Sequence, residues 1–245
     1  MALPQPTAPF TAEDYLRWEA GQPDKHEYYH GETFAMGGAS RRHVTISGNI
    51  FSALDEALEG SPCRAYMADM KVQAAADEAY FYPDVLVTCD PADHRADQFM
   101  RAPTLIVEVL SPATAAYDRG EKFAAYRRIP SLRDFVLIDP DLRRIEHYRR
   151  SQDERWELQD IAPEQALVLE SLEVSIPWQK VFRNADLART RATPPPHPGC
   201  PRGPRTTRNP PCMCKPTSPS MKPNTSRSRR ARRSATSTSP ATSSR

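Results

Sequence analysis

Short apolar runs with strand-like composition alternate with helically spaced segments over the first 190 residues of the chain. Alternation with a period of two predicts strands, whereas apolar residues recurring every three to four positions predict helices. The predicted strands cover a hairpin at 28–34 and the segments 63–73, 82–87, 104–110, 135–138, 145–148, 156–158 and 167–174, and the predicted helices cover 11–18, 40–59 and 114–129. Buried strands interleaved with helices predict an α/β fold, in which helices flank a mixed central β-sheet.

Two carboxylates interrupt this apolar pattern. Asp84 lies in the run 82–87, and Glu108 lies in the run 104–110. An ionised side chain removed from water costs several kcal/mol, roughly, unless a cation or hydrogen bonds compensate it. An ion pair with Arg or Lys would satisfy each acid. A shared divalent metal would satisfy both, and hard cations such as Mg²⁺ or Mn²⁺ prefer oxygen ligands.

The composition changes near residue 190. No Asp or Glu follows Asp186, and residues 191–245 hold 12 of the 33 Lys and Arg and 12 of the 25 Pro. Such a segment lacks the apolar residues that a core requires, so we expect residues 1–190 to form one domain and 191–245 a disordered basic tail. The tail would tether DNA phosphates by counterion release, or it is an extension produced by a shifted reading frame.

Without the tail, the remaining chain has 21 basic residues against 31 acidic ones, a balance of −10. A body this acidic does not attract nucleic acid through its overall field. Any DNA contact would depend on the tail or on local groups such as Arg41 and Arg42, for which a solvated helix face is the alternative interpretation.

Cysteine usage and the N-terminus favour a cytoplasmic protein. Only Cys63 and Cys89 lie before the tail, which gives no disulfide framework. The chain starts without a secretory leader and contains no apolar run near the ~18 residues of a membrane span. His197 and the tail cysteines lack the paired spacing of a zinc site.

A lysine follows the Glu108 segment on the next predicted helix. Lys122 is the only Lys between Lys71 and Lys180, and a short loop separates its helix from the strand that carries Glu108. A lysine near two metal-binding acids would stabilise the negative charge of a phosphoryl transition state. The alternative is a surface pair between Asp118 and Lys122, worth about 0.2–0.5 kcal/mol.

An ordered set of motifs then carries a family resemblance. The motifs are PD at 83–84, VEVLSP at 107–112, DRGEK at 118–122 with Tyr126, and FVLIDP at 135–140. Residues 10–182 resemble the Uma-type family of bacterial restriction-endonuclease-like proteins, within the PD-(D/E)XK nuclease superfamily. The resemblance implies a restriction-endonuclease-like fold, DNA as substrate, phosphodiester hydrolysis with Mg²⁺ or Mn²⁺, and a possible homodimer.

The resemblance also assigns roles to particular residues. In the superfamily the acid and the lysine stand two residues apart on one strand, but position 110 here is Leu. The resemblance implies that Lys122 replaces that lysine from the helix, with Asp84 and Glu108 as its catalytic and metal-binding partners. It further implies that Glu32 is an additional metal ligand or an acid that supports the metal ligands from behind. Arg119 is a further candidate for contact with nucleic acid. A family histidine matches His43, for which a core or capping role is equally open.

Two other functions fit parts of the sequence. Residues 26–30 read HEYYH, the H-E-x-x-H pattern of zinc metalloproteases. That chemistry needs a helix that places both His on one face, whereas Gly31 and adjacent tyrosines favour a strand. The second alternative is a catalytically inactive nucleic-acid-binding or assembly module of the same fold.

Overall fold

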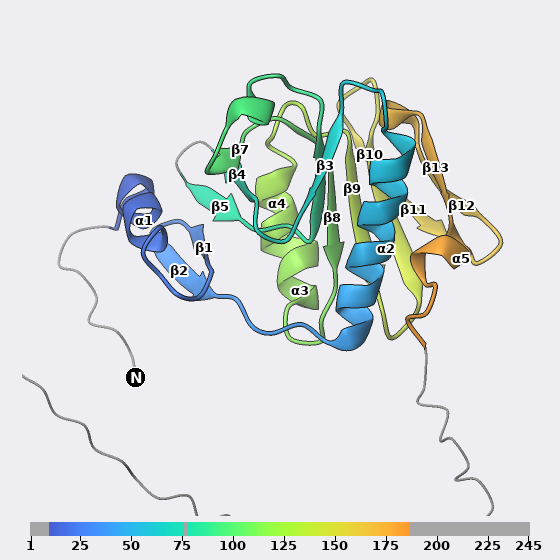
Figure 1. Ribbon diagram of the computed structural model, residues 1–245, viewed down its shortest axis with the longest axis horizontal. Coiled ribbons are helices and arrows are strands. Elements are labelled where there is room, and N and C mark those ends of the chain that lie inside the picture. Colours follow the sequence, from blue (N-terminus) through green and yellow to red (C-terminus); the bar gives the residue numbers. More distant parts are fainter. Residues whose placement is uncertain (1–9, 76–77, 187–245) are drawn as a thin grey trace, which may run out of the picture. The chain divides into compact units, whose positions relative to one another are not determined.

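The computed structural model describes residues 10–75 and 78–186, which form a mixed α/β fold (Figure 1). Within these residues no helix is long and apolar enough to cross a membrane. The predicted tail lies outside the described residues. In chain order the elements are α1 (Ala12–Glu19), β1 (His26–Tyr29), β2 (Glu32–Ala35), α2 (Arg41–Ala57), β3 (Arg64–Met67), β4 (Lys71–Ala75), β5 (Ala79–Phe81), β6 (Val85–Thr88), η1 (Asp93–Arg95), β7 (Phe99–Met100), β8 (Pro103–Val109), α3 (Ala115–Tyr117), η2 (Asp118–Lys122), α4 (Phe123–Tyr126), β9 (Asp134–Asp139), β10 (Arg144–Arg150), β11 (Trp156–Ile161), β12 (Ala166–Leu169), η3 (Glu170–Leu172), β13 (Val174–Pro177) and α5 (Trp178–Val181).

The strands form two main sheets and a separate β12–β13 hairpin. The first sheet has the order β2-β1-β5-β4-β7, and the second has the order β11-β10-β9-β8-β6-β3. In the second sheet β8 pairs in parallel with β9, while its other neighbours are antiparallel, so the sheet is mixed. The chain crosses from the first sheet to the second between β5 and β6, where Pro83 cannot donate to a ladder. Asp84 therefore lies at the junction of the two sheets.

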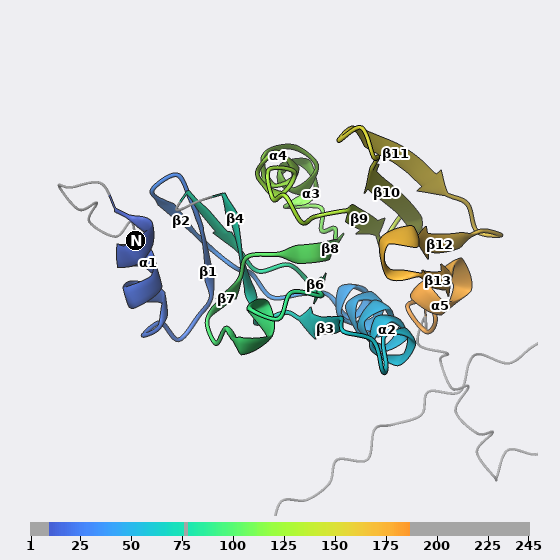
Figure 2. The ribbon, with the colours of Figure 1, turned by 90° about the horizontal axis from the view of Figure 1, so that it is seen from above.

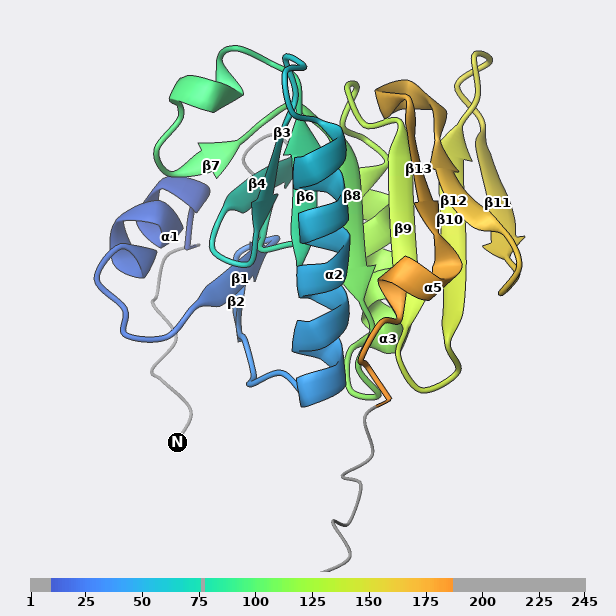
Figure 3. The ribbon, with the colours of Figure 1, turned by 45° about the vertical axis from the view of Figure 1, so that its right-hand side comes forward.

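Helices cover both faces of the second sheet, as Figure 2 shows from above. Helix α2 packs on one face, where its residues Ile46, Ile50 and Leu54 share a core with β6, β8 and β9. In Figure 3 this helix runs in front of β6 and β8, and the β12–β13 hairpin lies beside it. The segment α3–α4 covers the opposite face, with Tyr126 buried against Phe135. Both faces of the second sheet are thus buried, which explains why β8 and β9 consist of nearly continuous apolar runs.

The β1–β2 hairpin follows from its turn residues. His30 and Gly31 connect the strands with positive φ angles of 49° and 89°. A two-residue hairpin loop requires this left-handed geometry, which glycine adopts without a Cβ penalty. The predicted hairpin is therefore present.

The predicted helix at 114–129 is divided into three parts. Between α3 and α4 the backbone forms a π-helical segment, η2, over Asp118–Lys122. A π-helical insertion is uncommon and is often found at functional sites. Sequence periodicity did not predict it, because it preserves the helical character of the flanking turns.

The prediction that the cysteines give no disulfide framework needs one correction. Cys63 and Cys89 are bonded to each other. They flank the antiparallel pair formed by Arg64 on β3 and Thr88 on β6, so their side chains meet at neighbouring strand ends. The register that brings them together is a tertiary property that their separation of 26 residues does not reveal.

Candidate active site

Lys122 forms the centre of a buried charge cluster. Its Nζ lies 2.8 Å from Glu27 Oε1, 3.0 Å from Glu108 Oε1 and 3.8 Å from Asp118 Oδ1. Glu27 comes from β1 in the first sheet and Glu108 from β8 in the second, so the ammonium joins the two sheets. The predicted surface pair with Asp118 exists as one contact, but it is buried and belongs to this larger network.

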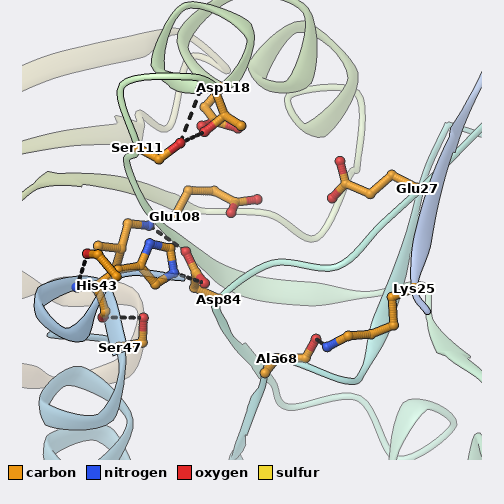
Figure 4. A network of polar contacts seen from close by, with 12 residues as sticks. Lys25, Glu27, His43, Ser47, Ala68, Asp84, Glu108, Ser111 and Asp118 are labelled. Carbon is orange, nitrogen blue, oxygen red and sulfur yellow. Dashed lines mark hydrogen bonds and ion pairs between the residues drawn. The ribbon is translucent and has the colours of Figure 1, made fainter. Parts of the chain in front are cut away.

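Asp84 lies on the open side of the same site. Its Oδ2 accepts a hydrogen bond of 2.7 Å from the backbone N–H of Val109, the residue after Glu108. Its Oδ1 lies 2.7 Å from His43 Nε2. Figure 4 shows Asp84 between His43 and Glu108, while Glu27 enters from the opposite direction. The Asp84 side chain is 21% exposed, whereas those of Glu108 and Lys122 are each 6% exposed, so the cluster opens to solvent at Asp84.

Burial determines the electrostatics of the cluster. Burial raises the pKa of Glu108 well above its ordinary value, and the nearby Lys122 charge offsets this only in part. The pKa of Asp118 is raised for the same reason. For Lys122, burial alone would lower the pKa, but Glu108, Glu27 and Asp118 together outweigh it and raise the pKa. Lys122 is therefore a cation throughout the physiological pH range.

Two further contacts hold the central groups in place. The hydroxyl of Tyr126 donates to Glu108 Oε1 at 2.9 Å, and the backbone N–H of Tyr82 donates to Glu27 Oε1 at 3.0 Å. The Lys122 ammonium also lies 5.5 Å from the ring centroid of Phe81. These partners fix the orientation of both carboxylates, because a buried acceptor with several donors has few alternative rotamers.

The donor set fits a hard divalent cation held by few protein ligands. Among the described residues, no group of three or more His, Cys, Asp or Glu side chains is arranged to hold a metal ion. Mg²⁺ commonly takes only one or two carboxylates and completes its shell with water and substrate phosphate oxygens. Asp84 and Glu108 supply two such carboxylates, of which Asp84 lies at the open side of the cluster and Glu108 is buried beside Lys122.

The other predicted site residues do not take part in the contacts of this cluster. Glu32 is exposed at the start of β2. Arg41 donates to the carbonyl of Asn184, and Arg42 pairs with Asp141. Arg119 directs its guanidinium to the buried Glu146 at 2.8 Å. Nucleic-acid contacts by these arginines stay predictions.

Glu27 is the functional candidate that the sequence interpretation missed. Its position in the HEYYH segment drew attention to a zinc motif, whereas its carboxylate pairs with Lys122. The available signal was an acidic residue directly before a predicted strand, a weaker form of the signal that identified Asp84 and Glu108. The contact depends on β1 pairing with β5, a long-range pairing that local patterns do not specify.

The zinc-protease alternative is not supported by the geometry. His26 lies in strand β1 and contacts Glu19, with 3.2 Å between His26 Nδ1 and Glu19 Oε2. His30 lies in the hairpin turn after that strand. The helix that would put both histidines on one face is absent from this segment, so the motif match is coincidental.

Comparisons with known proteins support the fold and the family. The Uma2 family model, described as "Putative restriction endonuclease", matches residues 12–179. Two uncharacterized proteins of Synechocystis sp. are similar: slr1290 is 39% identical over 75% of this chain and 98% of its own length, and sll1609 is 35% identical over 64% and 89%. A crystal structure from Anabaena variabilis, described as a putative nuclease belonging to DUF820, superposes with a TM-score of 0.60 at 18% identity, over 71% of this chain and 98% of that chain. That likeness confirms the predicted nuclease-like fold class. Because the family model spans most of the chain, the chain belongs to the Uma2 family of putative restriction endonucleases.

Proposed function

We propose that this protein is a divalent-metal-dependent endonuclease that hydrolyses phosphodiester bonds in DNA. Family membership supports a nuclease-like function. The observation that carries the proposal is the convergence of Glu108 and Lys122 at 3.0 Å, with Asp84 held beside them by the Val109 amide. Two carboxylates and a lysine at one partly open site are the groups that metal-assisted phosphodiester hydrolysis requires.

Asp84 and Glu108 would hold Mg²⁺ or Mn²⁺, which would activate the attacking water and offset charge on the phosphate. Lys122 stays protonated and stabilises the additional negative charge that develops on the phosphoryl oxygens. Glu27 and Tyr126 orient Lys122 and Glu108, respectively, so they are positioning residues. His43 fixes one oxygen of Asp84 and leaves the carboxylate at the solvent-accessible side.

A cleavage assay on single-stranded, duplex and branched DNA, in Mg²⁺, Mn²⁺ and EDTA, tests the proposal. We expect cleavage with either metal and none in EDTA. Asp84→Ala, Glu108→Ala and Lys122→Ala should each lower the rate by at least about 100-fold, as for loss of a transition-state charge partner. Glu56→Ala is the control, because this exposed acid pairs with Lys180 on the surface and makes none of the contacts of the cluster.

The alternative of an inactive nucleic-acid-binding module predicts a different result. DNA binding without metal-dependent cleavage on any of these substrates would support that module and contradict the endonuclease. Cleavage that persists in the Asp84 variant would assign the activity to another site or to a contaminant. The buried Lys122 network argues for catalysis over simple binding, because three carboxylates around one lysine do not attract DNA without a metal.

A further inference from the structure

An exposed aromatic residue lies next to the candidate active site. Phe34 on β2 pairs directly with Glu27 on β1 in the antiparallel register. Directly paired residues project from the same face with their Cβ atoms about 4.5–5.5 Å apart. Since Glu27 Oε1 lies 2.8 Å from Lys122 Nζ, Phe34 is the direct cross-strand neighbour of a residue of the cluster.

The exposure of Phe34 is unusual within this protein. Its exposed fraction is 42%, and it is the only exposed aromatic residue in the segments 10–75 and 78–186. The other exposed large apolar residues of these segments are aliphatic or Met. A planar ring at the surface is costly to leave in water and provides a face on which another ring can stack.

Tyr117 supports Phe34 from the helix side. The two ring centroids are 6.1 Å apart with an interplanar angle of 38°. Tyr117 immediately precedes the π-helical segment that carries Lys122, so the ring pair connects β2 to that segment. Its buried hydroxyl has no hydrogen-bond partner within the described part of the chain. Burial raises the pKa of the Tyr117 hydroxyl, and the nearby charge of Glu27 raises it further. This hydroxyl therefore keeps its proton and can donate a hydrogen bond beside the cluster.

The flank beyond Phe34 is open. Strand β2 is at the end of its sheet, and residues 32–42 are all exposed. An added Cβ at Gly37 or Gly38 would meet no atom within 4 Å. In Figures 1 and 3 this connection from β2 to α2 runs along the lower side of the coloured ribbon, the side at which α3 also lies. A polynucleotide strand therefore has room to lie along this segment.

We propose that Phe34, supported by Tyr117, stacks on an unpaired base next to the phosphodiester bond that is cut. The inference rests on the proposed nuclease function and specifies its substrate as single-stranded, frayed or flapped nucleic acid. Stacking on an aromatic side chain is worth about 1–3 kcal/mol per base and tolerates any base. A base in an intact duplex is already stacked and reaches Phe34 only after costly extrusion.

Binding and cleavage by Phe34→Leu and Phe34→Trp test this inference. The binding probe is a single-stranded oligonucleotide carrying 2-aminopurine, whose fluorescence falls on stacking, with Ca²⁺ in place of Mg²⁺. We expect Phe34→Leu to weaken binding by about 5- to 150-fold, the equivalent of the stacking free energy, and to abolish the quench. Phe34→Trp should restore both. Leu158→Ala, at another exposed apolar residue on edge strand β11, should change neither.

The outcomes separate this inference from the proposed function. If the Phe34→Leu variant binds the probe and cuts single strands as well as the unchanged protein does, the stacking role is wrong, but the proposed nuclease function stands. A preference for duplex over single-stranded DNA that Phe34→Leu does not alter would also overturn it. If no substrate is cut, the proposed nuclease fails, and the binding and quench measurements alone decide whether Phe34 stacks on bases. Unchanged thermal unfolding of Phe34→Leu excludes misfolding as the cause of any loss.

Discussion

Replacement of Lys122 by Met should destabilise the protein strongly and in a pH-dependent way. Methionine approximates the volume of the lysine stem but removes the charge that lies 2.8 Å from Glu27 and 3.0 Å from Glu108. Removal of one partner from a buried ion pair typically costs about 3–5 kcal/mol, because the remaining charge stays buried without compensation. We expect a loss of this size in the free energy of unfolding at neutral pH.

The pH dependence follows from the carboxylates that remain. The Lys122 charge lowers the pKa values of Glu108 and Asp118, which burial already raises above 4.5 and 3.8. In Lys122→Met both pKa values rise further above their unfolded values. At pH values between the pKa of these carboxyls in the unfolded state and their higher pKa in the folded state, the native state binds more protons than the unfolded state. The stability of the native state therefore falls as the pH rises through this range. The cost of Lys122→Met should therefore be smallest at about pH 5 and increase toward about pH 8.

Urea unfolding of the full chain at several pH values measures this effect. Lys180→Met is the matched control, because Lys180 pairs with Glu56 at 2.7 Å on the exposed surface, where solvent screens the charges. Its unfolding free energy should hardly change at any pH. A cost for Lys122→Met below about 1 kcal/mol at neutral pH, or one independent of pH, would refute the buried charge network.

Three further predictions concern the surroundings of the cluster. Tyr117→Phe should leave the unfolding free energy unchanged or raise it by about 1 kcal/mol, since the lost hydroxyl has no partner among the described residues. Tyr126→Phe should lower the unfolding free energy by about 1–3 kcal/mol, because Glu108 loses a hydrogen-bond donor. Urea unfolding compares the two variants, and the reverse order of stabilities would contradict these contacts. His43→Ala should weaken Mn²⁺ binding, measured by calorimetry, by about 10–100-fold through loss of the Asp84 contact, and unchanged affinity would remove His43 from the site. Truncation after residue 190 should leave thermal unfolding unchanged, because every core residue of the described segments precedes that point, and a lowered Tm would give the tail a structural role.

The elements of this fold follow largely from local patterns. The apolar spacing of 40–59 predicted helix α2 within two residues at each end, and the run 104–110 predicted β8 within one. The predicted strand at 63–73 is instead two strands that belong to different sheets. The chain bends between them at Ala68, where φ is 56°, and an alanine gives no sequence signal for that conformation.

The site was predictable only where one residue contradicts its local pattern. Asp84 and Glu108 stand out because each is an acid in an apolar run. Glu27 carries the same signal more weakly, in a short strand whose partner β5 is about fifty residues away along the chain. Its contact with Lys122 depends on the pairing of that sheet and on the π-helical segment, which are long-range and conformational properties rather than local ones.

Cleavage of DNA by Asp84→Asn, compared with the unchanged protein in Mg²⁺, tests the central claim most directly. Asparagine keeps the size of the side chain and an oxygen that can accept from the Val109 amide, so the fold and DNA binding should persist. We predict Mg²⁺-dependent cleavage by the unchanged protein and a rate at least about 100-fold lower for Asp84→Asn, since the metal loses a charged ligand. Cleavage by Asp84→Asn at the original rate would contradict the assignment of this site.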